Sequence, residues 1–161
     1  MDRKRDDAER WMRLAVAEAR RGVRAGDGGP FGAVLVCNGQ IIARGHNRVI
    51  ASNDPTAHAE IVALRRASHK LGRFHLPDCT VYTTCEPCPM CLAAMHWARI
   101  KVFYFGCDRR DAARIGFADK DIYDALAGRP VKGAPLARPL LREACLGVFA
   151  EWAGRTNKVL Y

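Results

Sequence analysis

The sequence has no apolar stretch long enough to cross a bilayer, and its first residues alternate Asp and Arg instead of joining a basic stretch to an apolar one. We therefore expect a soluble, cytoplasmic protein without a membrane contact. It also has no internal repeat and no low-complexity linker, which argues against a repeat array or flexibly joined modules. Its 161 residues, 49% of them hydrophobic, fit a single domain spanning residues 1–161.

The cysteines cannot all form disulfides within the chain, because there are seven of them, an odd number. Cys85, Cys88 and Cys91 form one CxxCxxC cluster, a spacing that favours metal binding in a reducing compartment over disulfides. The other four lie singly in apolar surroundings, and we expect them to be small buried hydrophobic residues: Cys37, Cys79, Cys107 and Cys145.

The balance of charge is basic, with 26 Lys and Arg against 17 Asp and Glu, a net charge of +9. A partner rich in phosphate would suit this charge. The basic residues are nevertheless scattered along the whole chain and form only short pairs, such as Arg20-Arg21. Nucleic-acid binding and general solubility both remain open interpretations of this charge.

Apolar residues recur with periods that predict an ordered series of helices and strands. Residues 33–37 and 41–44 indicate two strands joined at Asn38-Gly39, a dipeptide that accepts the positive φ of a tight hairpin turn. Further strands are predicted over 80–83, 101–105 and 138–142, and helices over 7–23, 56–71, 89–99, 121–127 and 146–153. This alternation favours a sheet covered by helices, with its first pair antiparallel and later members parallel. The Gly- and Pro-rich segment 128–139 is predicted as a loop.

Two short motifs carry the chemistry. His58-Ala59-Glu60 and the later Cys88-Pro89-Met90-Cys91 supply three metal ligands and one carboxylate beside the metal. Three protein ligands leave a fourth coordination position open, where zinc lowers the pKa of water from about 15.7 to about 7. The pattern therefore predicts a catalytic zinc site held by His58, Cys88 and Cys91.

A structural zinc site is the competing interpretation, because Cys85 could act as a fourth protein ligand and close the coordination sphere. Glu60 favours the catalytic interpretation, since a structural site does not need it. A carboxylate beside an activated water can first accept a proton from that water and then donate it to a departing amine. The chemistry expected of Glu60 is hydrolytic deamination of an amino-bearing ring carbon. The remaining histidines lack such neighbours in the sequence and are expected to be structural: His46, His69, His75 and His96.

Three segments carry a family resemblance that extends over nearly the whole chain. GGPFGAVLV at 28–36, SNDPTAHAE at 52–60 and TTCEPCPMC at 83–91 resemble the cytidine-deaminase-like superfamily, and within it the small bacterial guanine deaminases. Agreement continues at 96–99, at 116–119 and at the last residue, Tyr161. The resemblance implies a three-layer α/β/α sandwich with a mixed five-stranded sheet, one Zn²⁺ per subunit, and Glu60 as the proton shuttle.

The resemblance also implies the contacts with a purine base. Phe31 would stack on the ring, Asn47 would contact its edge, and Asp119 and Tyr161 would close over it. Each of the first three has a plainer alternative: Phe31 as a core aromatic, Asn47 as a turn cap, and Asp119 as a solvated carboxylate. Ala59 and Trp97 complete the expected substrate-binding set.

Trp97 also has a simpler role open to it, which is to pack its helix onto the core. In the resembling family, the C-terminal segment, here about 143–161, can be exchanged between two subunits. We therefore expect a homodimer in which Tyr161 completes the site of the partner subunit.

Guanine, converted to xanthine and ammonia, is the expected substrate. Guanosine, cytosine and ammeline are related alternatives. A tRNA adenosine deaminase would use the same zinc chemistry and would explain the charge, but Phe31 is bulkier than the aliphatic residue such pockets usually have, and no basic C-terminal helix follows. A non-catalytic, zinc-stabilised binding module is the alternative from a different class, and it predicts that Glu60→Gln leaves function intact.

Overall fold

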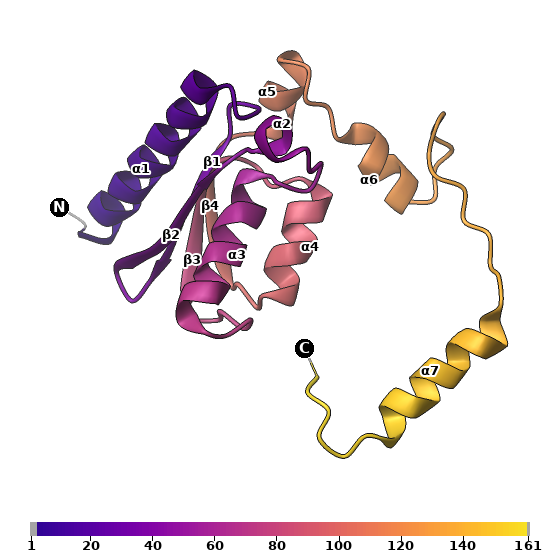
Figure 1. Ribbon diagram of the computed structural model, residues 1–161. Coiled ribbons are helices and arrows are strands. Elements are labelled where there is room, and N and C mark those ends of the chain that lie inside the picture. The colour runs from indigo at the N-terminus through magenta and orange to yellow at the C-terminus, as the bar shows by residue number, and fades with distance from the viewer. Residues whose placement is uncertain (1–2, 161) are drawn as a thin grey trace.

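A computed structural model describes residues 3–160 (Figure 1). In chain order its elements are α1 (Arg3–Ala25), β1 (Gly32–Cys37), β2 (Gln40–His46), α2 (Val49–Ser52), α3 (Ala59–Leu71), β3 (Cys79–Cys85), α4 (Pro89–Trp97), β4 (Val102–Cys107), α5 (Arg109–Arg114), α6 (Lys120–Leu126) and α7 (Arg142–Gly154). In these described residues, no helix combines the length and the apolar character that a membrane crossing requires.

Four strands form one mixed sheet in the order β2-β1-β3-β4. β1 runs antiparallel to both β2 and β3, and β3 runs parallel to β4. Asn38 and Gly39 take φ values of 50° and 75° between β1 and β2, so the predicted hairpin turn is confirmed.

The expected five-stranded sheet is wrong for the described residues, because the fifth strand, predicted over 138–142, does not form. This segment is coil up to the start of α7 at Arg142. A strand exists only where its backbone pairs with a neighbour, and here the chain has already left the sheet edge (Figure 1). The predicted loop over 128–139 is confirmed, since this stretch contains no helix or strand.

Helices cover both faces of the sheet: α1 lies on one face, and α3 and α4 lie on the other (Figure 1). Successive side chains of a strand point to opposite faces, and β1 is buried along its full length. Val34 therefore packs under Trp11 and Ala15 of α1, whereas Leu35 packs against Leu64 of α3 in the opposite core. This double burial explains why β1 is apolar throughout and does not alternate.

Close packing between α3 and β2 brings the metal motif onto the sheet. A Cβ atom placed on Gly45 of β2 would lie 2.5 Å from the backbone oxygen of Ala59. Only glycine therefore lets the first turn of α3 sit this close. α3 begins at Ala59, slightly later than predicted, and ends as predicted at Gly72, which adopts the left-handed conformation.

Of the four isolated cysteines, Cys37 and Cys79 are buried as expected, but they are not single. Cys37 and Cys79 are register partners at the ends of β1 and β3, and they form a disulfide. Sequence spacing alone does not reveal this pairing, because 42 residues separate the two cysteines. Cys107 and Cys145 are exposed and not buried, since β4 is an edge strand and α7 has no buried residue.

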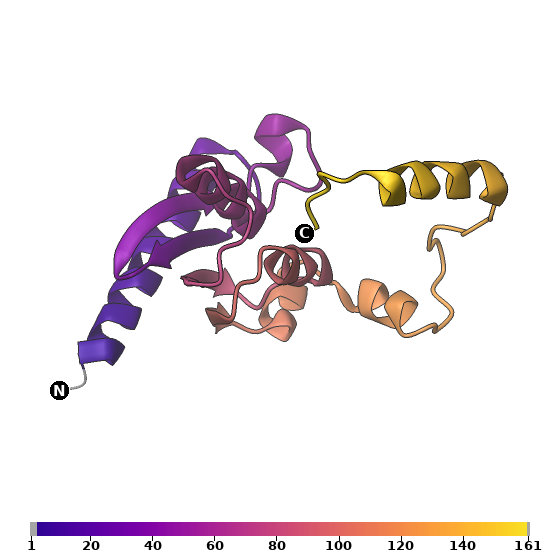
Figure 2. The ribbon, with the colours of Figure 1, turned by 90° about the horizontal axis from the view of Figure 1, so that it is seen from below.

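The C-terminal part of the chain leaves the body of the protein. Figure 2 shows the segment after α6 running outward and α7 standing apart from the sheet and its covering helices. Val148 and Phe149 of α7 are 60% and 70% exposed. Such exposure of large apolar side chains is typical of surfaces that another molecule covers.

Candidate metal centre and base cavity

Two helix N-termini bring the metal-ligating side chains together. His58 precedes α3 and Cys88 precedes α4, and both have extended backbone conformations. Pro89 begins α4 at a position where the missing N–H costs no hydrogen bond. Cys91 lies in the first turn of α4 and is fully buried. The partial positive charge of a helix N-terminus favours thiolate over thiol, which suits both cysteines to metal binding.

The three donor atoms have the spacing of a zinc site. Nδ1 of His58 lies 3.5 Å from Sγ of Cys88 and 3.6 Å from Sγ of Cys91, and all three donors lie within 4.8 Å of one another. Tetrahedral zinc, with Zn–S near 2.3 Å and Zn–N near 2.0 Å, holds a nitrogen and a sulfur ligand about 3.6 Å apart. The residues therefore fit a single zinc ion without rearrangement.

Protonation within this triad is coupled. The hydrogen bond from Cys91 lowers the pKa of the Cys88 thiol to about 4, and hydrogen bonding to Cys88 raises the pKa of His58. The same contact with Cys88, together with burial, raises the pKa of Cys91. Zinc binds cysteine as the thiolate, so metal binding would release any proton that the two thiols still hold.

Cys85 stands outside this donor group. Its buried thiol lies 3.8 Å from the backbone oxygen of Asp108, and it is not a member of the His58, Cys88 and Cys91 cluster. Burial raises the pKa of the Cys85 thiol to about 11, so it stays protonated at neutral pH. A closed site with four protein ligands is therefore not assembled by the described residues.

Glu60 lies beside the donor group and is 6% exposed. Its Oε1 accepts a hydrogen bond from the hydroxyl of Thr83 at 3.1 Å, and its Oε2 lies 3.5 Å from Sγ of Cys91. Burial raises the pKa of the Glu60 carboxyl. Raised carboxyl pKa values of this kind suit a group that both accepts and donates a proton near neutral pH.

A cavity of about 460 Å³ opens in front of Glu60 and His58. This volume lies in the range of small-molecule sites. Its walls come from the segment before β1, from α2, from the segment between β3 and α4, and from the chain between α5 and α6. Most of its lining is apolar, so it suits a flat ring with a few polar groups at its edge.

Several residues predicted to bind substrate line this cavity. Phe31 lies in its wall and meets Phe117 edge to face, with ring centroids 5.0 Å apart. Asn47 lines the cavity and also caps a turn, since its Oδ1 accepts the backbone N–H groups of Gly29 and Val49, each at 3.2 Å. The turn cap considered for Asn47 is therefore formed, and its contact with the edge of a purine ring stays a prediction.

Asp119 also lines the cavity, at the start of α6. Burial raises the pKa of its carboxyl, with a further contribution from nearby Cys88. The Asp119 side chain is thus partly buried in the cavity wall and is not a freely solvated surface group.

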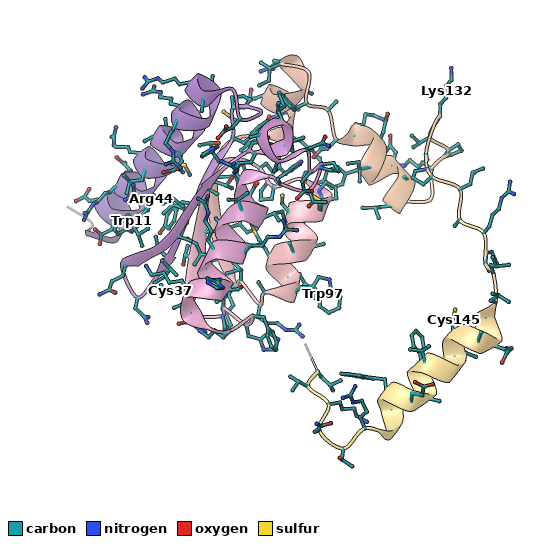
Figure 3. All side chains as sticks on the ribbon, in the orientation of Figure 1. Trp11, Cys37, Arg44, Trp97, Lys132 and Cys145 are labelled. Atoms are coloured by element: carbon teal, nitrogen blue, oxygen red, sulfur yellow. A yellow bond between two sulfur atoms is a disulfide. The ribbon has the colours of Figure 1, made fainter. Side chains whose placement is uncertain are left out.

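The other residues expected to bind substrate are not among the described residues that line the cavity. The side chain of Ala59 is fully buried in a small core cluster with Ala33 and Ala63, behind the cavity wall. Trp97 is 57% exposed and neither lines the cavity nor lies in the core. It is the last residue of α4, about 13 Å along the helix from Cys88, and Figure 3 shows it at the far end of that helix. Tyr161 lies outside the described residues.

Sequence reasoning missed several lining residues. Val49 and Ile50 come from α2, and Arg109 comes from α5. These helices have four and six residues, too short for a periodic pattern to show. The N-cap signal of Asp108, followed three residues later by acidic Asp111, could have indicated α5, because the structure forms a reciprocal capping box there.

Known proteins are similar to this chain in sequence and in structure. Residues 5–107 match the family model of the cytidine and deoxycytidylate deaminase zinc-binding region. Guanine deaminase from Bacillus subtilis is 47% identical over 95% of this chain and 98% of its own, and its crystal structure superposes with a TM-score of 0.88. The structure of a guanine deaminase from Nitrosomonas europaea is 30% identical, with a TM-score of 0.64, over 88% of this chain and 81% of its own.

A tRNA-specific adenosine deaminase from Agrobacterium fabrum is 50% identical, but over only 60% of this chain and 62% of its own. The similarity to guanine deaminase thus extends into the C-terminal part of this chain, whereas the similarity to the tRNA-specific adenosine deaminase covers a shorter stretch. The chain has a zinc-type donor triad with a buried carboxylate beside it, and the family model matches more than half of its sequence. It therefore belongs to the cytidine and deoxycytidylate deaminase family of zinc-binding enzymes.

Proposed function

We propose that this protein catalyses the hydrolytic deamination of guanine to xanthine and ammonia. The observation that carries the proposal is the position of Glu60, which lies beside the three-donor group at the inner end of a cavity large enough for a purine base. Similarity to a bacterial guanine deaminase over 95% of the chain supports the choice of guanine.

One Zn²⁺ per subunit would be held by His58, Cys88 and Cys91. Zinc in such a site supplies a water of lowered pKa as the nucleophile. Cys85 stays out of the coordination sphere in this proposal, because its thiol is protonated and lies close to the backbone oxygen of Asp108.

Glu60 carries out the proton transfers in this proposal. Its carboxylate accepts a proton from water and passes it to a ring nitrogen, which makes the neighbouring carbon more electrophilic. The carboxylate then takes the proton of the new hydroxyl group on that carbon and gives it to the departing amine, so that the carbonyl forms as ammonia leaves. Thr83 holds Oε1, so the orientation of the carboxylate is fixed before the base arrives.

Recognition of the base would come from the cavity walls. Phe31 offers an aromatic face, and because Oδ1 of Asn47 is engaged by backbone N–H groups, its amide nitrogen is the part left to donate to the ring edge. Asp119 offers an acceptor for ring N–H or amino groups. Guanine has an acceptor for the Asn47 amide and N–H and amino donors for Asp119, which supports guanine over purines that lack these donors.

The direct experiment is to incubate the zinc-loaded protein with guanine and to measure xanthine and ammonia, with guanosine, cytosine, adenine and ammeline in parallel. Turnover of guanine with the highest kcat/KM is the expected result. Absence of ammonia from guanine, with turnover of another member of the panel, would contradict the proposal.

We also propose a homodimer in which the segment from about 143 to 161 exchanges between subunits. The exposed apolar side chains of α7 and of the two residues before it support this, because the described part of the same chain leaves them exposed: Leu140, Leu141, Val148, Phe149 and Trp152. A mainly apolar groove of about 430 Å³ between α1 and β4 offers an apolar surface of the kind such a helix needs.

Mixing two inactive variants tests the exchange. Glu60→Gln lacks the proton shuttle, and Tyr161→Ala lacks the C-terminal ring that the partner would supply. In an exchanged heterodimer, one of the two sites has Glu60 from one chain and Tyr161 from the other, so refolding the variants together should restore activity. Two unexchanged chains would give no restored site, and light scattering would show whether a dimer forms at all.

A tRNA adenosine deaminase is the second candidate, supported by the net charge of +9 and by 50% identity with such an enzyme over 96 residues. Steeply salt-dependent binding of tRNA, together with inosine formation, would favour it. We place the reaction in the cytoplasm, where reducing conditions keep Cys88 and Cys91 available to the metal.

A further inference from the structure

A cluster of ionisable side chains surrounds the buried His46, outside the metal centre. His46, at the end of β2, is 3% exposed, and its Nε2 lies 2.6 Å from Oδ2 of Asp27. On its other side, Nδ1 lies 3.5 Å from Oε2 of Glu18 on α1. Arg21 pairs with Glu18 at 2.8 Å, and Arg48 pairs with Asp27 at 3.2 Å.

None of these five side chains lines the base cavity, so the proposed reaction does not use them directly. Ion pairs that are exposed or partly buried add little net stability, because screening by water or desolvation offsets most of their attraction. Their best supported use is to hold neighbouring segments in one arrangement.

Asp27 connects the cluster to both sides of the cavity wall. Its backbone oxygen accepts the N–H groups of Ile50 and Ala51 at 3.1 and 3.0 Å, which fixes the start of α2. Its side chain joins His46 at the end of β2 to Arg48 just before α2. The next residues along the chain, Gly28 and Gly29, and Ile50 of α2 all line the cavity.

The cavity wall that contains Gly28 and Gly29 is closely packed. A Cβ atom on Gly28 would lie 2.1 Å from Oδ1 of Asn47, and that oxygen already accepts the N–H of Gly29. A small displacement of the segment that follows Asp27 would therefore move Asn47, Phe31 or both. The metal ligands, by contrast, are held by α3 and α4 and share no hydrogen bond with Asp27.

We propose that Asp27 is a positioning residue for the base cavity, which acts through His46 and Arg48 to hold the wall that contains Gly29, Phe31 and Ile50. The inference rests on the proposed deamination of guanine, whose kinetics supply its readout. Loss of the Asp27 side chain loosens the wall that binds the ring and leaves the metal ligands and Glu60 in place. Substrate binding should weaken while the chemical step is retained.

The test compares Asp27→Ala, Asp27→Asn and Arg48→Met with the unchanged protein. Asp27→Ala should raise KM for guanine about tenfold, with kcat within about twofold and zinc content unchanged, because loss of a hydrogen bond to a charged group costs roughly that factor. Asp27→Asn keeps the shape and one hydrogen-bonding oxygen, and it should recover part of the loss. Arg48→Met removes only the ion pair and should give a smaller rise in KM.

Asp78→Ala is the matched control, since Asp78 forms a 2.8 Å pair with Arg73 away from the cavity. It should leave KM unchanged. If Asp27→Ala and Arg48→Met both leave KM unchanged and lower only the melting temperature, the positioning role is wrong and the cluster is merely structural. If Asp27→Ala does not fold, the KM values of Asp27→Asn and Arg48→Met decide the question.

Failure of the proposed function gives a different result. In that case the unchanged protein does not deaminate guanine, and KM is measured with whichever base of the panel it does deaminate. The positioning role is then supported or overturned by the same comparison of the four variants.

Discussion

The hydroxyl of Thr83 donates to Oε1 of Glu60 at 3.1 Å, and both side chains are buried. Thr83 belongs to β3 and Glu60 to the first turn of α3, so the sheet itself orients the carboxylate. Oε2 is left directed toward the metal-ligating group, at 3.5 Å from Cys91.

Thr83→Val keeps the shape of the side chain and removes this hydrogen bond. We expect kcat to fall at least about tenfold, because a hydrogen bond to a charged group is worth on the order of 1.5 kcal/mol or more. Steady-state kinetics with guanine measure the effect, and Thr80→Val on the same strand is the control. Equal kcat values for the two variants would show that Thr83 does not orient Glu60.

Zinc binding should depend on Cys91 and not on Cys85, although both belong to the same CxxCxxC motif. Cys91→Ala removes a fully buried donor and should lose most of the metal, whereas Cys85→Ala should keep about one zinc per chain. Metal analysis after gel filtration gives the stoichiometry. Loss of zinc from Cys85→Ala, with its fold intact, would restore the interpretation of a closed structural site.

The disulfide between Cys37 and Cys79 predicts the number of reactive thiols. Protein denatured with a chelator and without reductant should show five free thiols, because Cys85, Cys88, Cys91, Cys107 and Cys145 are unpaired. Reduction should raise the number to the seven cysteines of the sequence. Seven thiols before reduction would mean that the two strand ends are not bonded in solution.

Asp108 predicts a pH dependence of stability. It caps α5, and its hydrogen bond with Arg110 lowers the pKa of its carboxyl to about 2 from an ordinary 3.8. A lowered folded-state pKa stabilises the protein above the unfolded-state pKa, and this contribution is lost as the pH falls through the folded-state value. Asp108→Ala should therefore be less stable than the unchanged protein at neutral pH, and the difference should shrink between about pH 4 and pH 2.

Denaturant unfolding across this pH range measures the difference. Asp108→Asn keeps an oxygen for the cap and removes the charge, so it should retain part of the stability at neutral pH without the acid-dependent change. A stability difference between Asp108→Ala and the unchanged protein that stays constant down to pH 2 would contradict this account.

Local sequence signals predicted the elements that position the metal ligands. The Asn38-Gly39 turn, the apolar run of β1 and the Gly72 stop of α3 each depend on neighbouring residues, and each is found as expected. His58 is an N-cap and not a first-turn residue, a shift of the size usual at helix ends.

Features that depend on distant contacts were not predicted. The disulfide joins residues 42 positions apart, and it follows only from the register of β1 on β3. The fifth strand was expected from its composition, but a strand also needs a partner that the chain does not bring to 138–142. Ala59 and Trp97 share motifs with site residues, yet the turn of their helices directs them elsewhere.

The proposed role of Glu60 is to move protons in the deamination of guanine, and the Glu60→Gln variant tests that role. Xanthine formation is compared between the zinc-loaded protein and zinc-loaded Glu60→Gln, with zinc content and folding checked in the same samples. We expect turnover by the unchanged protein and its loss, by at least about a hundredfold, in the variant. Equal turnover by both proteins at equal zinc content would contradict the account.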